Sequence, residues 1–322
     1  MQAAWYSQLG AAKDVLMVGE LPAPEPAAGE VRVRLHTSGV NPSDVKSRRA
    51  RAITDPFIVP HSDGAGVIDA VGSGVPASRL GQRVWVWNGQ WQRAMGTAAQ
   101  YIVLPQAQAV ELPEGTDFAA GACLGIPALT ALQALNLAGD VQGKQVLIIG
   151  ASSAVGHYAA QIARLRGAQV IGTAGSEAKM AHARAAGVQE TINYKTEAVV
   201  DRLKALSGGR GVDVIIDMDL STTAAWVAQG ALARHGQHIC YGSNALDVTL
   251  AYRTFLYASV NLKFFLVYDL HDADRQLALS QLTAMLPKLQ HTIGQRFPLS
   301  QIAQAHEAVE AGAFGNVVID LV

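Results

Sequence analysis

The chain has 322 residues, of which 50% are hydrophobic and 16% are charged, and its formal net charge at pH 7 is −1. Its length suits two domains that each have a core, and so apolar a composition excludes an intrinsically disordered chain. The longest basic cluster is the short stretch 46–51, which we interpret as a solvated loop, so the charge pattern favours neither nucleic acid nor an anionic membrane as a partner.

The N-terminal stretch lacks the basic start and apolar run of a secretory signal, and no window approaches the roughly 18 apolar residues of a membrane span. Cys123 and Cys240 lie far apart, each in an apolar run, which favours two reduced buried thiols over a disulfide. We therefore expect a cytoplasmic protein.

The first third of the chain alternates short apolar runs with turns rich in Pro and Gly, such as 21–30. This pattern predicts an antiparallel or mixed β domain. The predicted strands cover residues 30–40, 64–72, 82–87 and 98–105.

From about Cys123 the pattern changes to apolar strands that alternate with amphipathic helices. Such alternation predicts βαβ units, in which helices cover both faces of a parallel sheet, and hence an α/β fold with a doubly wound sheet. The predicted helices cover 128–138, 156–167 and 177–187, and the strands cover 144–150, 168–175, 190–194, 212–218 and 237–242. A strand at 262–267, helices at 272–289 and 299–312 and a strand at 315–322 complete the chain.

Residues 145–156 combine a buried strand, a tight turn and the start of a helix, an arrangement in which backbone N–H groups can receive a pyrophosphate. Only Gly150 and Gly156 match the glycines of the dinucleotide motif. The physical need is for small side chains, and the hydroxyls of Ser152 and Ser153 can donate to phosphate, so the stretch favours a nucleotide site. A purely structural turn is the alternative.

The end of the next strand indicates which nucleotide is preferred. An NAD-binding fold has an acidic residue about 20 residues after the glycines, where this chain has Ala174. Ser176 and Lys179 follow at once and Tyr194 comes later, and hydroxyl and ammonium groups favour the 2′-phosphate of NADP(H). Glu177 is an acidic neighbour that weakens this argument.

Three tryptophans, Trp85, Trp87 and Trp91, lie close together in sequence. Strand alternation predicts that Trp85 and Trp87 share one face. That face either packs in the core, which is the commoner use of aromatic residues, or forms a flat wall for a planar substrate.

Taken together, these segments resemble the medium-chain dehydrogenase/reductase superfamily and, within it, the zinc-free quinone oxidoreductase or zeta-crystallin-like branch. The resemblance covers essentially the whole chain, and its most specific segments are 39–46, 59–75 and 125–135. It implies a GroES-like β-rich catalytic domain (1–122 and 268–322) with an inserted NADP(H)-binding Rossmann domain (123–267). It also implies an active site in the cleft between the domains.

By the same resemblance, residues of both domains contact NADPH. The implied residues are Asn41 and Thr130 at the nicotinamide end; Ser152, Ser153, Ala154 and Val155 at the pyrophosphate; Ser176, Lys179 and Tyr194 at the 2′-phosphate; Tyr241, Gly242, Ser243, Phe265, Leu266 and Val267 beside the nicotinamide; and Asn316 from the C-terminal segment.

The chain departs from the zinc-containing members of the superfamily at their metal ligands. Where those members have a Cys and a His-Glu pair, this chain has Asn41 and the pair Ser62-Asp63, and His61 falls one position early. A catalytic zinc needs three protein ligands, so we expect no metal.

Without a metal, the resemblance implies hydride transfer from NADPH to quinones or α,β-unsaturated carbonyl compounds, in which developing charge is delocalised. The candidate catalytic residues are Asn41, Asp44 and Lys46, and Lys46 stands where some quinone-reducing relatives have a tyrosine. A capping role for Asp44 fits equally well, and solvent can supply the proton.

Two other functions remain open at this stage. An enoyl-thioester reductase of the same superfamily would use a basic rim, which Arg48, Arg49 and Arg51 could provide. An NADPH-binding crystallin-like or RNA-binding protein is the other, although basic and aromatic residues do not interleave as in RNA-binding domains. By analogy with relatives, the stretches 246–254 and 262–269 could pair across a two-fold axis and form a homodimer.

Overall fold

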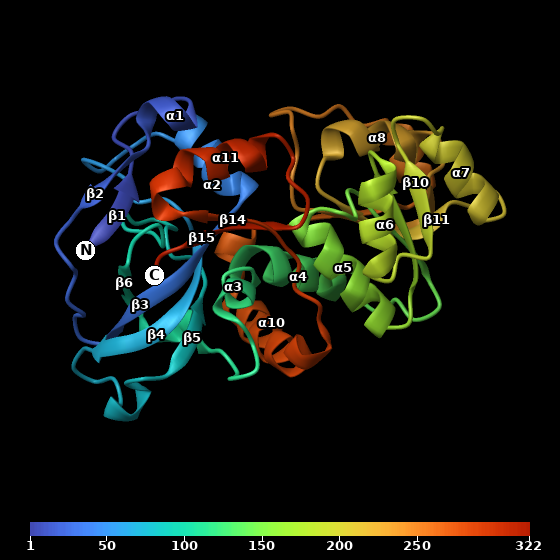
Figure 1. Ribbon diagram of the computed structural model, residues 1–322. Helices are drawn as coiled ribbons and strands as arrows, with labels where there is room; N and C mark the ends of the chain where they lie inside the picture. The colour runs from blue at the N-terminus through green and yellow to red at the C-terminus, as the bar shows by residue number, and fades with distance from the viewer. The chain divides into compact units, whose positions relative to one another are not determined.

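The computed structural model describes all 322 residues, and they form two compact units (Figure 1). Unit 1 comprises residues 1–126 and 291–322, and unit 2 comprises residues 127–290, so unit 2 interrupts unit 1 in sequence. None of the helices is both long and apolar enough to span a lipid bilayer. The cytoplasmic location stays a prediction.

Unit 1 is built on a seven-stranded sheet in the order β14-β15-β3-β4-β5-β7, with β6 paired to β3. Alternation along β3 places Val31, Val33 and Leu35 in the core, where they are fully buried. The strands of this unit are β1 (Gln2–Trp5) and β2 (Met17–Glu20), which form a separate pair, and β3 (Glu30–Val40), β4 (Asp63–Val71), β5 (Arg83–Val86), β6 (Tyr101–Pro105), β7 (Ala109–Glu111), β14 (Ile293–Pro298) and β15 (Asn316–Asp320).

The sequence pattern predicted one helix of unit 1, at 299–312, and missed the other three. The interpretation of 46–51 as a solvated loop was wrong, because most of it lies in α2 and the side chain of Arg48 is fully buried and paired with Glu310. Figure 1 shows α2 beside α11, which provides that carboxylate. The helices are α1 (Ala12–Val15), α2 (Pro42–Ala50), α3 (Phe118–Gly121) and α11 (Ile302–Glu310), with 3₁₀ turns at Ala77–Arg79, Gln106–Gln108 and Leu299–Gln301.

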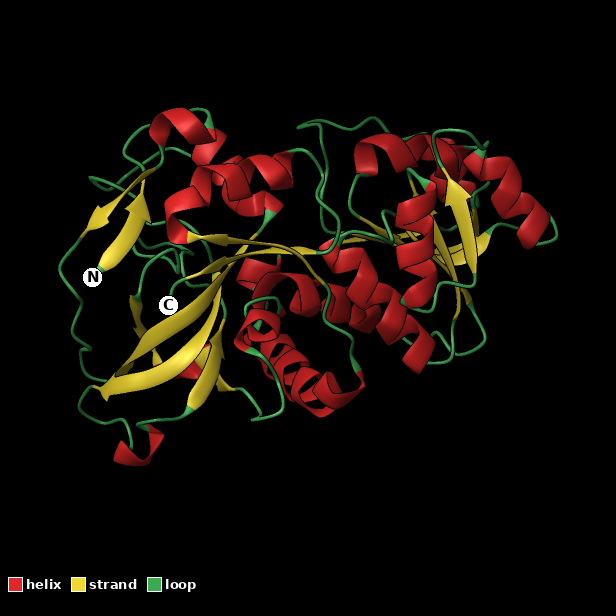
Figure 2. Ribbon diagram, in the orientation of Figure 1, coloured by secondary structure: helices red, strands yellow, loops and turns green.

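Unit 2 contains the predicted doubly wound sheet, with six strands in the order β10-β9-β8-β11-β12-β13 and every neighbouring pair parallel. Figure 2 shows helices on both faces of this sheet, which explains why Val146, Leu147 and Ile148 of the central strand β8 are all fully buried. The strands are β8 (Gln145–Ile148), β9 (Gln169–Ala174), β10 (Glu190–Asn193), β11 (Val212–Asp217), β12 (Leu232–Cys240) and β13 (Asn261–Phe264).

The helices of unit 2 extend further along the chain than the domain boundary implied by the resemblance. The segment 268–290, assigned above to the catalytic domain, lies in unit 2, because its helix α10 packs on α4 (Figure 1). The helices are α4 (Leu129–Ala138), α5 (Ala154–Leu165), α6 (Glu177–Ala185), α7 (Val199–Leu206), α8 (Leu220–Ala228), α9 (Tyr252–Tyr257) and α10 (Asp272–Met285), with a π-helical turn at Leu124–Ala128 and 3₁₀ turns at Val267–Asp269 and Leu286–Lys288.

Candidate active site

The turn between β8 and α5 has the geometry of a phosphate-binding loop. Gly150 has φ +66°, a left-handed conformation that favours glycine. Gly156 has no room for a side chain, because a Cβ there would lie 2.2 Å from the carbonyl oxygen of Gly150. The two glycines singled out in the sequence are therefore the ones that allow the chain to turn tightly into the helix.

The four residues predicted at the pyrophosphate lie together at the N-terminus of α5. Ser153 caps the helix, and its Oγ accepts a hydrogen bond from the backbone N–H of Gly156 at 3.0 Å. Its hydroxyl hydrogen remains able to donate to a phosphate oxygen. Ser152 is buried, whereas Ala154 and Val155 are half-buried in the first turn, where N–H groups have no helical acceptor and the helix dipole favours an anion.

The carboxyl end of β9 gathers three of the residues expected near a 2′-phosphate. Ala174 is buried, and a Cβ on the next residue, Gly175, would meet the Tyr194 hydroxyl at 2.6 Å and Cε of Lys195 at 3.2 Å. Ser176 then caps α6. The sequence analysis missed Lys195, although its place directly after Tyr194 was the available signal.

The first turn of α6 contains Lys179 and the acidic neighbour Glu177. The backbone N–H of Lys179 donates to the Ser176 Oγ at 3.4 Å, so the helix starts at this strand end. Glu177 forms an ion pair with Arg184. The carboxylate that weakened the case for NADP(H) therefore has a cationic partner of its own.

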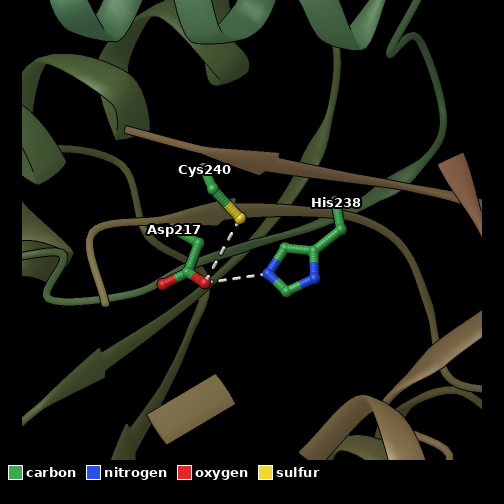
Figure 3. Close-up of side chains that lie close together, drawn as sticks. All are labelled: Asp217, His238 and Cys240. Atoms are coloured by element: carbon green, nitrogen blue, oxygen red, sulfur yellow. Dashed lines mark hydrogen bonds and ion pairs between the residues drawn. The ribbon is translucent and has the colours of Figure 1, made fainter. Parts of the chain in front are cut away.

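Asp217, His238 and Cys240 form a fully buried cluster at the carboxyl ends of β11 and β12 (Figure 3). Asp217 Oδ2 lies 2.8 Å from Nε2 of His238, and it accepts from the Cys240 thiol at 3.7 Å. The same carboxylate accepts from the Thr223 hydroxyl and, at 2.7 Å, from the backbone N–H of Asp219.

These hydrogen bonds account for the buried carboxylate of Asp217 without a metal. Burial, followed by the charge of Asp217, raises the pKa of the Cys240 thiol, so the sulfur stays protonated and weakly nucleophilic. We interpret the cluster as the support that holds two neighbouring strand ends in place.

A pocket of about 370 Å³ begins where this cluster ends, since Cys240 is one of its walls. Of the six residues predicted beside the nicotinamide, Tyr241, Gly242, Ser243 and Phe265 line this pocket. The other two do not: Leu266 is half-exposed, and Val267 lies in the following 3₁₀ turn, where its carbonyl oxygen accepts a hydrogen bond from Arg275. Pocket residues that the sequence analysis missed are Leu220, Ala245, Leu246, Val248, Leu250 and Phe264.

Two further predicted contacts belong to different units. Thr130 is buried in α4 of unit 2. Asn316 begins β15 of unit 1, where its Nδ2 donates to the carbonyl of Thr292 at 2.9 Å and its Oδ1 is buried without a partner.

In unit 1, Asn41 joins two buried carboxyl groups. Its Nδ2 donates to Asp63 Oδ2 at 2.9 Å, and its backbone N–H donates to Asp44 Oδ2 at 2.7 Å. Asp63 Oδ2 also accepts from the N–H of Ile126 at 3.0 Å, whereas its Oδ1 is buried without a partner.

The burial of this group has a chemical consequence. It raises the pKa of Asp44 to about 7 and the pKa of Asp63 well above its ordinary value. Asn41, Asp44 and Asp63, which we call the Asn41 group, can therefore hold a carboxyl proton near neutral pH. The structure does form the capping contact at Asp44, and it places Lys46 on the exposed side of α2.

The residues beside the zinc-ligand positions of other superfamily members are occupied by internal hydrogen bonds. His61 Nδ1 lies 2.9 Å from Ser38 Oγ, and its Nε2 lies 2.9 Å from Nε2 of His306. Burial lowers the pKa of His61 to about 3. Cys123 Sγ donates to the carbonyl of Ala119 at 3.1 Å.

Trp85 and Trp91 do not form a common wall. Trp85 is fully buried in β5 and serves the core. The ring of Trp91 instead lies under the guanidinium of Arg51, at 5.0 Å from its centroid.

A β-rich GroES-like unit together with a doubly wound unit that carries a phosphate-type loop defines a nucleotide-dependent dehydrogenase or reductase. Comparison with known proteins agrees. Residues 27–114 match the alcohol dehydrogenase GroES-like domain family, and residues 154–284 match the zinc-binding dehydrogenase family. The chain is 30% identical to human quinone oxidoreductase over 325 residues, which cover 99% of this chain and 97% of the relative.

Solved structures give the same result. A structure described as an NAD-dependent alcohol dehydrogenase is 30% identical, covers both chains completely and superposes with a TM-score of 0.88. A mycobacterial protein in complex with NADPH is 25% identical, covers 99% of this chain and all of its own, and has a TM-score of 0.87. The chain belongs to the medium-chain dehydrogenase/reductase superfamily, in the quinone oxidoreductase branch, which confirms the resemblance found in the sequence.

Proposed function

We propose that the chain is an NADPH-dependent oxidoreductase that needs no zinc and reduces quinones or α,β-unsaturated carbonyl compounds. The observation that carries the proposal is the edge beyond β9, where buried Ala174 replaces the acidic residue of NAD-binding folds and Tyr194 and Lys195 lie alongside. The name of the human relative and the NADPH complex of the mycobacterial one support it.

A catalytic zinc does not fit this chain. At the ligand positions of the zinc-containing members, Asn41 and Asp63 are hydrogen-bonded to each other. His61, one position away, is hydrogen-bonded to Ser38 and His306. Three free protein ligands are not available there. No step of the reaction is therefore assigned to a metal.

When bound, NADPH supplies the hydride. The N-terminus of α5 would hold the pyrophosphate through backbone N–H groups, and Lys179 and Lys195 would provide positive charge for the 2′-phosphate. A quinone that accepts a hydride must also accept a proton to become a hydroquinone. The Asn41 group holds such a proton, and Asp44, with a pKa of about 7, is the donor that we propose.

The test is anaerobic oxidation of NADPH with 1,4-benzoquinone, run beside NADH and in the presence of a metal chelator. We expect turnover that prefers NADPH and resists the chelator. A preference for NADH, as the name of one structural relative suggests for that protein, would contradict the cofactor assignment. Inhibition by the chelator would contradict the absence of zinc.

The two alternative functions are tested in the same preparation. Arg48 and Arg49 both pair with Glu310, so two of the three arginines invoked for a thioester substrate are already occupied. Turnover of crotonyl-CoA without turnover of benzoquinone would nevertheless favour the enoyl-thioester reductase. Crosslinking to RNA that NADPH competes away, without turnover of either substrate, would favour a binding protein.

A further inference from the structure

Unit 1 contains a pocket of about 320 Å³ that no part of the proposed mechanism uses. We propose that this pocket binds a carboxylate group of the substrate through the hydroxyl of Tyr6 and the guanidinium of Arg51. We call it the Tyr6–Arg51 pocket, and its walls include Asp55, Gln90 and Arg93. The inference rests on the proposed function and defines its substrate class more narrowly.

Tyr6 offers a hydroxyl that the fold does not use. The residue is only 3% exposed, and its backbone pairs with that of Ile58. Its hydroxyl has no hydrogen-bond partner in the chain, yet it is not sealed from solvent, so it opens to the pocket. An acceptor on a ligand can therefore take the place of water at this hydroxyl. Burial raises the pKa of Tyr6 to about 12, so the group remains a donor.

Arg51 offers a guanidinium without an ionic partner. Arg48 and Arg49 in α2 both pair with Glu310, whereas Arg51, the C-cap residue of this helix, forms no ion pair and stacks over the ring of Trp91. Stacking holds the planar group in place without using its N–H donors. A guanidinium fixed in this way can bind both oxygens of a carboxylate.

The charge of the pocket also favours an anion. Arg93 donates to Gln108 Oε1 at 2.6 Å and to the carbonyl of Val103 at 3.4 Å, and neither acceptor neutralises it. The pocket wall contains one acidic residue, Asp55, and two arginines, Arg51 and Arg93. The pocket therefore has a net positive charge.

The pocket adjoins the Asn41 group within unit 1. Asp44 lies in the first turn of α2, and Arg51 is the C-cap residue at the other end of this helix. The charges of both residues act on Tyr6, and the charge of Arg51 also acts on Asp44. A substrate whose carboxylate occupies the pocket would thus have its remaining atoms near the proposed proton donor.

The experiment compares two enones that differ in charge, trans-3-benzoylacrylate and its methyl ester, as acceptors for NADPH oxidation. The measured quantity is the ratio of kcat/KM for the acid to kcat/KM for the ester. We expect the wild type to prefer the acid, and Arg51→Gln and Tyr6→Phe each to lower the ratio about tenfold, as the loss of one charge-assisted or buried hydrogen bond would. Arg51 is exposed, so its substitution leaves folding intact.

The matched control is Arg49→Gln, which removes an arginine of the same helix that lies outside the pocket and should keep the wild-type ratio. The inference would be overturned by a wild type that does not prefer the acid, or by variants that lower kcat/KM equally for the acid and the ester. Benzoquinone turnover, measured in parallel, tests the proposed function separately. If neither enone reacts, calorimetric binding of benzoylacrylate decides: binding that Arg51→Gln weakens supports the pocket, and no binding overturns it.

Discussion

Asp44 makes the stability of unit 1 depend on pH. Burial raises its pKa from 3.8 to about 7, so between these values the folded protein holds a proton that the unfolded chain has released. The stabilisation is complete below the lower value and is lost as the pH rises through the upper one. His61 acts in the opposite sense, because its lowered pKa removes stability as the pH falls below the ordinary histidine value of 6.5.

We expect Asp44→Asn to remove the loss of stability that ionisation of Asp44 causes as the pH rises. Relative to the wild type, the variant should gain at most about 4 kcal/mol as the pH rises from 4 to 8, since the buried amide never has to ionise. Thermal unfolding measured across this range tests the prediction, and His61 is common to both proteins. Asp14→Asn, at an exposed position in α1, is the control. Parallel curves for Asp44→Asn and the wild type would contradict the prediction.

Lys179 and Lys195 carry the proposed discrimination between cofactors. Removing one ammonium from the 2′-phosphate should weaken NADPH binding about tenfold per variant and leave NADH binding almost unchanged. Fluorescence titration of Lys179→Ala and Lys195→Ala with both nucleotides measures this. Lys288→Ala, at an exposed lysine of the same unit, is the control. Equal losses for NADPH and NADH would place the two lysines elsewhere than at the 2′-phosphate.

At the scale of elements, the contact between β8 and α5 leaves no space for a single methyl group. Gly156→Ala would bring a Cβ to 2.2 Å from the backbone oxygen of Gly150, so the turn must shift. We expect a loss of roughly 1–3 kcal/mol of stability and a clear loss of NADPH affinity. Gly115→Ala, where a Cβ meets nothing within 4 Å, is the control. Unchanged nucleotide binding by Gly156→Ala would mean that this turn does not hold the pyrophosphate.

The strands of unit 2 could be predicted because their signals are local, whereas its helices α7, α8 and α9 were missed. Residues 146–148 of β8 are all apolar since both faces of the sheet are covered, and a glycine with positive φ follows at position 150. Helix α2 could not be predicted in this way, since Arg48 is buried by pairing with Glu310, which lies 262 residues away in sequence.

The residues of the candidate site likewise fall into those that a local sequence pattern predicts and those that it does not. The residues of the phosphate loop follow one another in sequence, so the motif identifies them. Asp63 and Tyr6 depend on partners from other elements: the first is bonded to Asn41, and the second faces a pocket with Arg51. No local pattern distinguishes them from ordinary core residues.

At the scale of the whole molecule, the sheet of unit 2 ends in an unpaired edge strand, β13. Phe264 on this strand is 63% exposed, and Tyr252 and Tyr257 on α9 are 71% and 68% exposed. We propose that this surface meets the same surface of a second copy, which would bury the aromatic side chains and extend the sheet.

Light scattering after size-exclusion chromatography should therefore give the mass of a dimer, and Phe264→Arg should shift the chain towards the monomer. Leu165→Arg, which changes an exposed apolar residue on α5, should leave the dimer intact. A wild type that elutes as a monomer would contradict the proposal.

The position of β15 in the sheet of unit 1 affects how the chain folds while the ribosome synthesises it. This last strand lies between β14 and β3, and it pairs Val317–Asp320 with residues 37–40 of β3. Unit 2 is contiguous and can fold as soon as it has emerged, whereas β3 keeps an open edge until residues 316–320 of β15 are synthesised. At usual rates of translation, the interval between the synthesis of β3 and the synthesis of β15 is roughly 15–60 s. During this time the nascent first unit exposes an unpaired strand that chaperones could bind.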